Sequence, residues 1–269
     1  MLLTVDIGNT VVTLGVFDGD RLVTTLRVAT DTRRLVDEYG ATLSNLLELK
    51  GTAADQITAA CLCSVVPPLT LVFEEVCRSF FGVNPLIVSA GVRTGLPILY
   101  DNPRDVGADR IADAVAAIQL YTPPIIVVDL GTATVFDAIS RNGEYLGGAI
   151  APGINLAADS LFFNTSQLRR VELIAPSAAI GRNTTSALQS GLVLGYAGLV
   201  SGIVERFKSE IGQDAKVIGT GGLVNIIAPE APVFDFLNQD LTLIGLRLIY
   251  QMNQSKQTAD GADDWTAGR

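Results

Sequence analysis

Three short apolar runs joined by tight turns occur twice in this chain, and this repeat limits the fold more than any other feature of the sequence. Asp18-Gly19-Asp20 in the first copy and Asn142-Gly143 in the second mark a hairpin turn between the second and third runs. The predicted strands are 2–7, 11–17, 22–28, 125–128, 135–140 and 145–150. A three-stranded meander repeated at half the chain length predicts two similar α/β lobes.

The segments outside the meanders supply helices and further strands. Amphipathic stretches predict helices, and short apolar runs predict strands. The predicted helices are 37–49, 70–80, 109–119 and 185–208, and the further strands are 57–66, 217–218 and 241–243. We place the lobe boundary at Tyr121-Thr122-Pro123-Pro124, which gives lobes of 1–121 and 122–253. The polar remainder, 254–269, is expected to be a disordered tail.

The composition excludes several classes of protein. Of 269 residues, 48% are hydrophobic and 17% are charged, so the chain is not disordered as a whole. It contains 19 Lys and Arg against 28 Asp and Glu, and the net charge of −9 argues against a nucleic-acid partner. It contains no His. That excludes Ser-His-Asp and Cys-His nucleophiles, and it leaves acid–base chemistry to carboxylates, Lys, Tyr or Cys.

The cysteines and the first residues bear on the cellular compartment. Cys61, Cys63 and Cys77 lack the spacing of a metal site, and alternation places the first two on one face of a strand. We interpret all three as buried, reduced thiols that act as small hydrophobic residues, which suits a cytoplasmic protein. The N-terminal segment has no basic region and reaches Asp6 at once, so we expect no signal peptide.

One uncharged stretch has nearly the length of a membrane span. It runs from Arg182 to Glu205, but it begins with polar residues, and its apolar part, 192–204, is too short to cross a bilayer comfortably. We therefore expect a buried helix and no membrane partner. Its glycines would permit close packing, which makes this helix our candidate for a subunit interface. They are Gly191, Gly195, Gly198 and Gly202.

Three glycine-containing turns follow predicted strands. Asp6-Ile7-Gly8-Asn9-Thr10 and Asp129-Leu130-Gly131-Thr132 each place a carboxylate before a turn whose amides and hydroxyl can meet phosphate oxygens. Gly219-Thr220-Gly221-Gly222 is a third such turn. Each alone is better explained as an ordinary β-turn with a capping aspartate, but matched copies plus the third turn favour phosphate binding. The sequence contains neither a P-loop nor a strand-linked dinucleotide motif.

Paired Asp-Gly-Thr loops in duplicated lobes resemble the acetate kinase, sugar kinase, Hsp70 and actin superfamily. Within it, the chain resembles the type III pantothenate kinases over Asp6 to about Asn253. Val135 stands where many members have Thr, but Thr132 and Thr134 remain. The segments that carry the resemblance are Asp6–Thr10, Ser64–Pro67, Asn102-Pro103, Val106–Arg110, Asp129–Thr134, Gly147–Gly153, Gly181–Thr184, Gly219–Gly222 and Leu243–Leu246.

The resemblance implies a fold, a reaction and a set of site residues. The family fold is a pair of duplicated ribonuclease H-like (actin-like ATPase) lobes with mixed sheets flanked by helices, usually as a homodimer. The implied reaction is phosphorylation of pantothenate to 4′-phosphopantothenate by ATP with magnesium, the first step of coenzyme A biosynthesis. Asp109 would be the catalytic base, and Asp129 would bind a monovalent cation, potassium or ammonium. The implied contacts are ATP binding by Asp6, Ile7, Gly8, Asn9, Thr10, Val11, Val12, Thr13 and Thr132, and pantothenate binding by Tyr100, Gly107, Ala108, Asp109, Arg110 and Thr184.

Several of these roles have a structural alternative. Asp109 opens a predicted helix, where a carboxylate is favoured by the helix dipole alone. Arg110 either pairs with the substrate carboxylate or is an ordinary surface residue. Tyr100 either packs against the gem-dimethyl group of pantothenate or belongs to the core. Thr184 contacts the substrate, caps the following helix, or does both.

The two loop aspartates need separate roles. Carboxylates that face one triphosphate repel it unless cations intervene, so we expect the magnesium of the nucleotide near Asp6 and a monovalent ion at Asp129. The transition state of phosphoryl transfer is loose, and the alcohol loses its proton late, so a carboxylate base such as Asp109 suffices. This fits a chain that contains no His.

Two other functions compete with the kinase interpretation. A regulatory protein of the same fold, a transcription accessory factor, is disfavoured by the net charge and by the intact Asp6, Asp109 and Asp129. A superfamily kinase or phosphatase that acts on another small acid is disfavoured by Gly107-Ala108-Asp109-Arg110, which a sugar or acetate kinase is not expected to carry.

Overall fold

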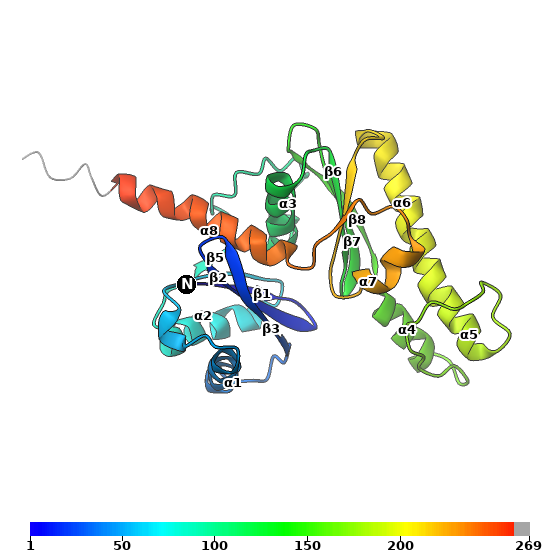
Figure 1. Ribbon diagram of the computed structural model, residues 1–269, viewed down its shortest axis with the longest axis horizontal. Coiled ribbons are helices and arrows are strands. Elements are labelled where there is room, and N and C mark those ends of the chain that lie inside the picture. The colour runs from blue at the N-terminus through cyan, green and yellow to red at the C-terminus, as the bar shows by residue number, and fades with distance from the viewer. Residues whose placement is uncertain (261–269) are drawn as a thin grey trace, which may run out of the picture. The chain divides into compact units, whose positions relative to one another are not determined.

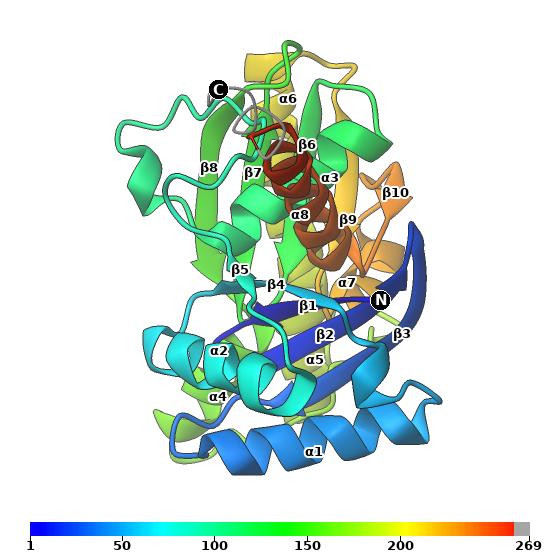
Figure 2. The same ribbon diagram turned by 90° about the vertical axis from the view of Figure 1, so that its left-hand side faces the viewer.

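The structure, a computed structural model, contains two five-stranded sheets with equivalent strand orders (Figures 1 and 2). It describes residues 1–260, without the side chains of 255–260. One sheet has the order β3-β2-β1-β4-β5 and the other β8-β7-β6-β9-β10, so the predicted duplication is confirmed. The strands are β1 Leu2–Ile7, β2 Val11–Asp18, β3 Arg21–Ala29, β4 Ala59–Ser64, β5 Leu86–Ile87, β6 Ile125–Leu130, β7 Ala133–Ile139, β8 Tyr145–Pro152, β9 Lys216–Thr220 and β10 Phe236–Leu237.

The helices lie between and after these strands. The principal ones are α1 Val36–Leu49, α2 Pro67–Phe81, α3 Ala108–Leu120, α4 Ile154–Phe163, α5 Thr184–Gln189, α6 Gly195–Ile211, α7 Val224–Ile227 and α8 Leu241–Asp260. All four predicted helices are present with shifted ends, whereas α4, α7 and α8 were not predicted. The expected strand at 241–243 is wrong, because these residues form the first turn of α8.

The chain forms two compact units that are not contiguous in sequence. Unit 1 consists of Met1–Gly95, Arg104–Ala116 and the chain from Thr242 onward, and unit 2 consists of Leu96–Pro103 and Ala117–Leu241. The division differs from the predicted lobes 1–121 and 122–253, because α8 returns to unit 1. Residues 254–260 of the expected tail continue α8 as backbone helix, and the rest of that tail lies outside the described residues.

In unit 1, β1 lies at the centre of the sheet, antiparallel to β2 and parallel to β4. Its side chains Leu3, Val5 and Ile7 are fully buried, as the apolar run predicts. Helices α1 and α2 cover one face of this sheet (Figures 1 and 2). Helix α8 packs on the other face, where Leu243 lies close to Gly15 of β2. The sheet is therefore buried on both faces, which fixes the position of the residues at the ends of its strands.

In unit 2, β6 occupies the position that β1 has in unit 1, antiparallel to β7 and parallel to β9. The pairing of β7 with β8 shifts between Ala138 and Ile139, as the pairing of β2 with β3 shifts between Val16 and Phe17. Each unit thus carries a β-bulge near the end of its second strand, a further sign of duplication.

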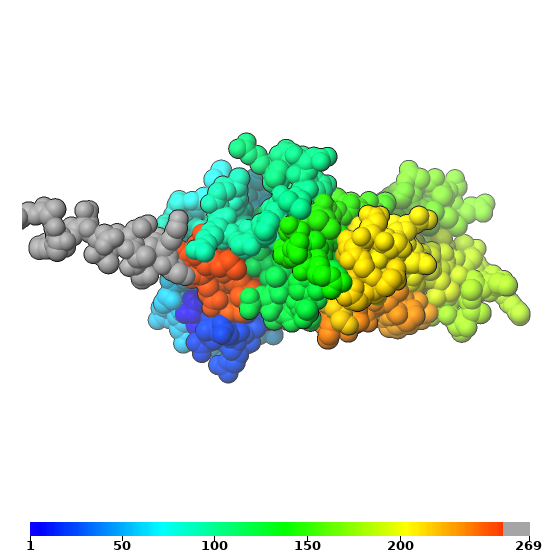
Figure 3. Space-filling view, turned by 90° about the horizontal axis from the view of Figure 1, so that it is seen from above, coloured from blue at the N-terminus to red at the C-terminus, as the bar shows by residue number. Residues whose placement is uncertain are grey.

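Residues 184–211 form one long helix in which a π-helical turn, Ser190–Leu194, joins α5 to α6. By length and composition this helix could cross a membrane, but Val193, Val200 and Val204 pack into the core of unit 2. The prediction of a buried helix is wrong in part, because only one side of the helix packs into the core. Apart from the adjacent residues and the nearby backbone of its own helix, a Cβ added at each of the four glycines meets no atom within 4 Å. The glycine face is open, and α6 lies at the surface of unit 2 (Figure 3).

Candidate active site

Unit 1 brings together two carboxylates and a thiol that are far apart in the sequence. Asp6, the last residue but one of β1, lies opposite Cys63 of the parallel strand β4. The Cys63 thiol donates a hydrogen bond to Asp6 Oδ1 with a distance of 3.4 Å. The carboxylate of Asp109, in the first turn of α3, lies near enough to act electrostatically on both groups. Asp6 and Asp109 are the two unit 1 residues expected to lie nearest the chemistry.

The electrostatics of this cluster favour the protonated forms of Asp6 and Cys63. Burial, and then the charge of Asp109, raise the pKa of Asp6 from 3.8 to about 7, while the hydrogen bond from Cys63 opposes the rise. Burial, and then the charges of Asp6 and Asp109, raise the pKa of the Cys63 thiol well above its usual value. Cys63 is therefore a protonated donor at neutral pH. A cation placed beside the two carboxylates would relieve their repulsion.

The backbone before α3 determines how Asp109 lies. Asp109 Oδ1 accepts a hydrogen bond from the amide of Arg110 at 2.9 Å. A side chain at Gly107 would clash with the same oxygen. Gly107 therefore leaves the space into which the Asp109 carboxylate folds, and the Arg110 amide holds it there. The prediction that Asp109 opens a helix is confirmed.

The turn between β1 and β2 is held by Thr30, which follows β3. The Gly8 amide donates to the Val11 carbonyl at 3.2 Å. Thr30 donates its hydroxyl to the Gly8 carbonyl at 2.7 Å and its amide to the Thr10 carbonyl at 3.0 Å. Asn9, Thr10 and Val11 are exposed at the tip of the turn. The turn that was predicted to bind phosphate is thus both exposed and supported from the neighbouring strand.

The corresponding turn of unit 2 lies beside Asp129 and a second glycine turn. Asp129 is the last residue but one of β6, and Gly131 donates its amide to the Ala133 carbonyl at 3.0 Å. A side chain at Gly221, in the third glycine turn, would clash with Asp129 Oδ1 and with the backbone of Leu130. Two of the three predicted glycine turns therefore meet at Asp129.

The remaining predicted residues lie in both units. Tyr100, Thr132 and Thr184 belong to unit 2, while Gly107, Ala108 and Arg110 belong to unit 1. Tyr100 is half-buried, and Thr132 and Thr184 are exposed. Thr184 is the first residue of α5 rather than its cap, because Asn183 Oδ1 accepts the Ser186 amide at 2.9 Å. The expected capping role of Thr184 is therefore wrong.

Sequence reasoning missed two members of the site. Cys63 was treated as a small hydrophobic residue, and its burial is confirmed, but its hydrogen bond to Asp6 depends on the pairing of β1 with β4. The alternation that places Cys61 and Cys63 on one face of a strand gave a partial signal. Thr30 carried no signal, because its two bonds follow from the register between β2 and β3.

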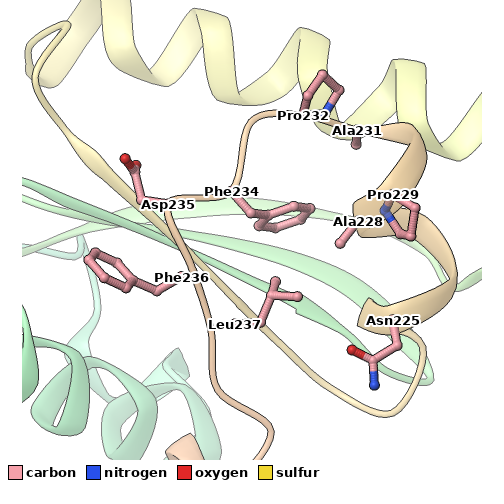
Figure 4. A pocket seen from close by; sticks show the side chains of 9 residues that line it. All are labelled: Asn225, Ala228, Pro229, Ala231, Pro232, Phe234, Asp235, Phe236 and Leu237. Atoms are coloured by element: carbon pink, nitrogen blue, oxygen red, sulfur yellow. The ribbon is translucent and has the colours of Figure 1, made fainter.

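Two observations limit what the described residues can hold. Among the side chains that the structure describes, those of residues 1–254, there is no cluster of three or more Cys, Asp or Glu that could hold a metal ion. Magnesium that arrives on phosphate oxygens needs only one or two carboxylates, so Asp6 and Asp109 fit such an ion. A separate cavity of about 350 Å³ in unit 2 lies beside α7 and contains none of the predicted site residues (Figure 4). It is lined by Asn225, Ala228, Pro229, Ala231, Pro232, Phe234, Asp235, Phe236 and Leu237.

Solved structures identify the class of fold. The activator of 2-hydroxyisocaproyl-CoA dehydratase from Clostridium difficile matches with a TM-score of 0.53 at 13% identity, over 99% of both chains. The ethanolamine utilization protein EutJ from Carboxydothermus hydrogenoformans matches with a TM-score of 0.53 at 14% identity, over 92% of this chain and 89% of that one. With the duplicated sheets, these matches define the two-lobed, ribonuclease H-like fold of the actin-like ATPases.

Sequence relatives identify the family within that class. The model of the type III pantothenate kinase family matches residues 2–206. The type III pantothenate kinase of Geobacter sulfurreducens is 50% identical over 254 residues, which is 94% of this chain and all of that protein. That of Myxococcus xanthus is 49% identical over 255 residues, which is 95% of this chain and all of that protein. The chain belongs to the type III pantothenate kinase family, as the sequence resemblance indicates. It is therefore a kinase for pantothenate that uses ATP with a divalent metal.

Proposed function

We propose that Asp109 is the general base that accepts the proton of the pantothenate hydroxyl as ATP phosphorylates it to 4′-phosphopantothenate. The observation that carries this proposal is the approach of Asp109 to Asp6 at the end of the central strand of unit 1. A loose transition state leaves the alcohol little acidity until late, so the base must above all be correctly placed. Gly107 and the Arg110 amide supply that placement.

The ATP phosphates are assigned to Asp6–Thr13 and to Thr132. The exposed tip at Asn9 and Thr10 offers backbone amides and a hydroxyl, and Thr30 keeps the turn in one conformation. Bound magnesium would neutralise phosphate charge beside Asp6 and Asp109, whose carboxylates repel each other in its absence. The raised pKa of Asp6 reflects negative charge that is poorly balanced in the protein alone, and a bound cation would balance it.

Asp129 is assigned to a monovalent cation, potassium or ammonium. Its carboxylate packs against Gly131 and Gly221 and offers two oxygen atoms as ligands. Oxygen ligands of this kind suit a hard, weakly charged ion. The assignment fails if replacing potassium with a large inert cation leaves turnover unchanged.

Pantothenate is assigned to Tyr100, Gly107, Ala108, Asp109, Arg110 and Thr184. The Arg110 guanidinium can pair with the substrate carboxylate, and the Tyr100 ring can face its gem-dimethyl group. We also propose a cytoplasmic homodimer. Support for the dimer comes from the open glycine face of α6, because small residues allow two helices to approach closely.

The test is pantothenate-dependent release of ADP by wild type, Asp109→Asn and Asp105→Asn. Asp105 is an exposed carboxylate four residues away, and it serves as the matched control. Loss of a general base is expected to lower kcat by about 10²–10⁴, with ATP binding retained. Equal turnover of the two variants would refute the role of Asp109. A folded wild type without pantothenate-dependent turnover would instead favour a regulatory role or another small acid as substrate.

A further inference from the structure

Within unit 2, the segment that carries Tyr100 is fixed to β8 through one residue. The Tyr145 amide donates to the Pro97 carbonyl at 2.8 Å, and the Leu99 amide donates to the Tyr145 carbonyl at 2.8 Å. Ile98 and Tyr145 form a parallel bridge. Because these bonds lie on either side of Ile98, they determine where the next residues, including Tyr100, leave the sheet.

The side chain of Tyr145 is held by a hydrogen bond to a buried carboxylate. Its side chain is fully buried, and its hydroxyl donates to Asp137 Oδ1 at 2.7 Å. Asp137 lies on β7 and is only 2% exposed. A buried carboxylate is costly unless it is hydrogen-bonded, so the Tyr145 hydroxyl is strongly constrained to stay at this position.

Gly147 makes the space in which the Tyr100 ring lies. The rings of Tyr100 and Tyr145 are 6.3 Å apart, with an interplanar angle of 57°. A Cβ added at Gly147 would lie 3.3 Å from Tyr100 Cε2 and 3.4 Å from its Cδ2. Gly147 also has a φ of 136°, and it follows the bulge at Leu146, where the strand is re-aimed. The Tyr100 ring is therefore bounded by the Tyr145 ring and by bare backbone of β8.

We infer that Gly147 and the Tyr145–Asp137 pair are positioning residues that hold the Tyr100 ring in place as the apolar wall for the branched aliphatic end of the substrate. The inference rests on the proposed contact between Tyr100 and pantothenate. Neither Gly147 nor Asp137 needs to touch the substrate. They act through Tyr100, because any movement of β8 or of the ring changes the wall that the substrate meets.

The test compares Gly147→Ala with Gly143→Ala by steady-state kinetics. Gly143, with a φ of 76°, lies in the turn between β7 and β8, and a Cβ there makes only ordinary contact with Ile118. Both variants carry the strain of a side chain at positive φ, but only the first meets Tyr100. Gly147→Ala is expected to raise the pantothenate KM about tenfold, with kcat and the ATP KM close to wild type. Tyr145→Phe is expected to act in the same direction.

A double-mutant cycle separates positioning from general damage. In a Tyr100→Ala background there is no ring to displace, so adding Gly147→Ala should cause no further rise in pantothenate KM. Independent, multiplicative effects of the two changes would overturn the inference, as would equal kinetic effects of Gly147→Ala and Gly143→Ala. A normal pantothenate KM in Tyr100→Ala alone would overturn the proposed contact and the inference with it. Wild type without pantothenate-dependent turnover would overturn the proposed function itself.

Discussion

Replacing Asp6 with Asn is expected to stabilise the nucleotide-free protein at neutral pH while it abolishes most of its activity. Burial and the neighbouring Asp109 raise the pKa of Asp6 from 3.8 to about 7. Between these two values the folded state binds a proton that the unfolded state has released. The free energy of unfolding therefore falls as the pH rises from about 4 through 7, and the contribution of the proton is lost above 7.

The size of the effect follows from the shift. A change of about three pKa units corresponds to about 4 kcal/mol, at about 1.4 kcal/mol a unit. Asp6 keeps partial contact with water, which screens its charge, so we expect about half of that, ~2 kcal/mol, to be recovered by Asp6→Asn at pH 8. For a chain of this length such a gain raises the Tm by about 4–8 °C.

The assay is thermal and urea unfolding of chelator-treated, nucleotide-free protein at pH 5, 6, 7 and 8. The gain for Asp6→Asn over wild type should grow with pH, because wild type loses the bound proton and the variant has none to lose. Asp55→Asn, a change at an exposed carboxylate, should alter stability equally at each pH. A variant no more stable than wild type at pH 8, or a gain independent of pH, would refute the reasoning.

Three further changes test other parts of the structure. Cys63→Val removes the donor that lowers the pKa of Asp6, so the acidic limb of the kcat/KM profile should move to higher pH, and Cys63→Ser should restore it. Gly245→Ala places a methyl group against the backbone of α3 and should cost about 1–3 kcal/mol in urea unfolding. Asn183→Ala removes the cap of α5 and should cost about 1 kcal/mol, measured by urea unfolding, with Thr184→Ala as the neighbour that leaves the cap intact.

Local chemistry made most of the meanders predictable from the sequence. Asp18-Gly19-Asp20 and Asn142-Gly143 admit few backbone conformations besides hairpin turns, and each fixes the strands on either side. The apolar run 2–7 then places Asp6 near the end of a buried strand. The same argument applies to Asp129, so both aspartates were located without tertiary information.

The parts of the fold and site that were not predicted from the sequence depend on contacts between distant segments. Helix α8 has Leu243 and Leu246 fully buried, yet its apolar residues near 241 also match a short strand. Only the packing of Gly245 against α3 distinguishes the two. The neighbours of Asp6 were missed for the same reason, because Cys63 reaches it through parallel pairing, which no turn specifies.

The duplicated fold places an aspartate near the end of the central strand in both units, but the residues around the two aspartates differ. Asp6 pairs in register with Cys63, and Asp129 pairs in register with the buried Thr220, so each aspartate faces a short side chain across a parallel pair. The carboxylate of Asp109 lies near enough to Asp6 to raise its pKa, whereas Asp129 packs against Gly131 and Gly221. Two neighbouring carboxylates favour a doubly charged ion, which supports magnesium beside Asp6. The monovalent ion proposed at Asp129 rests instead on its carboxylate oxygens and on the glycine turns packed against them.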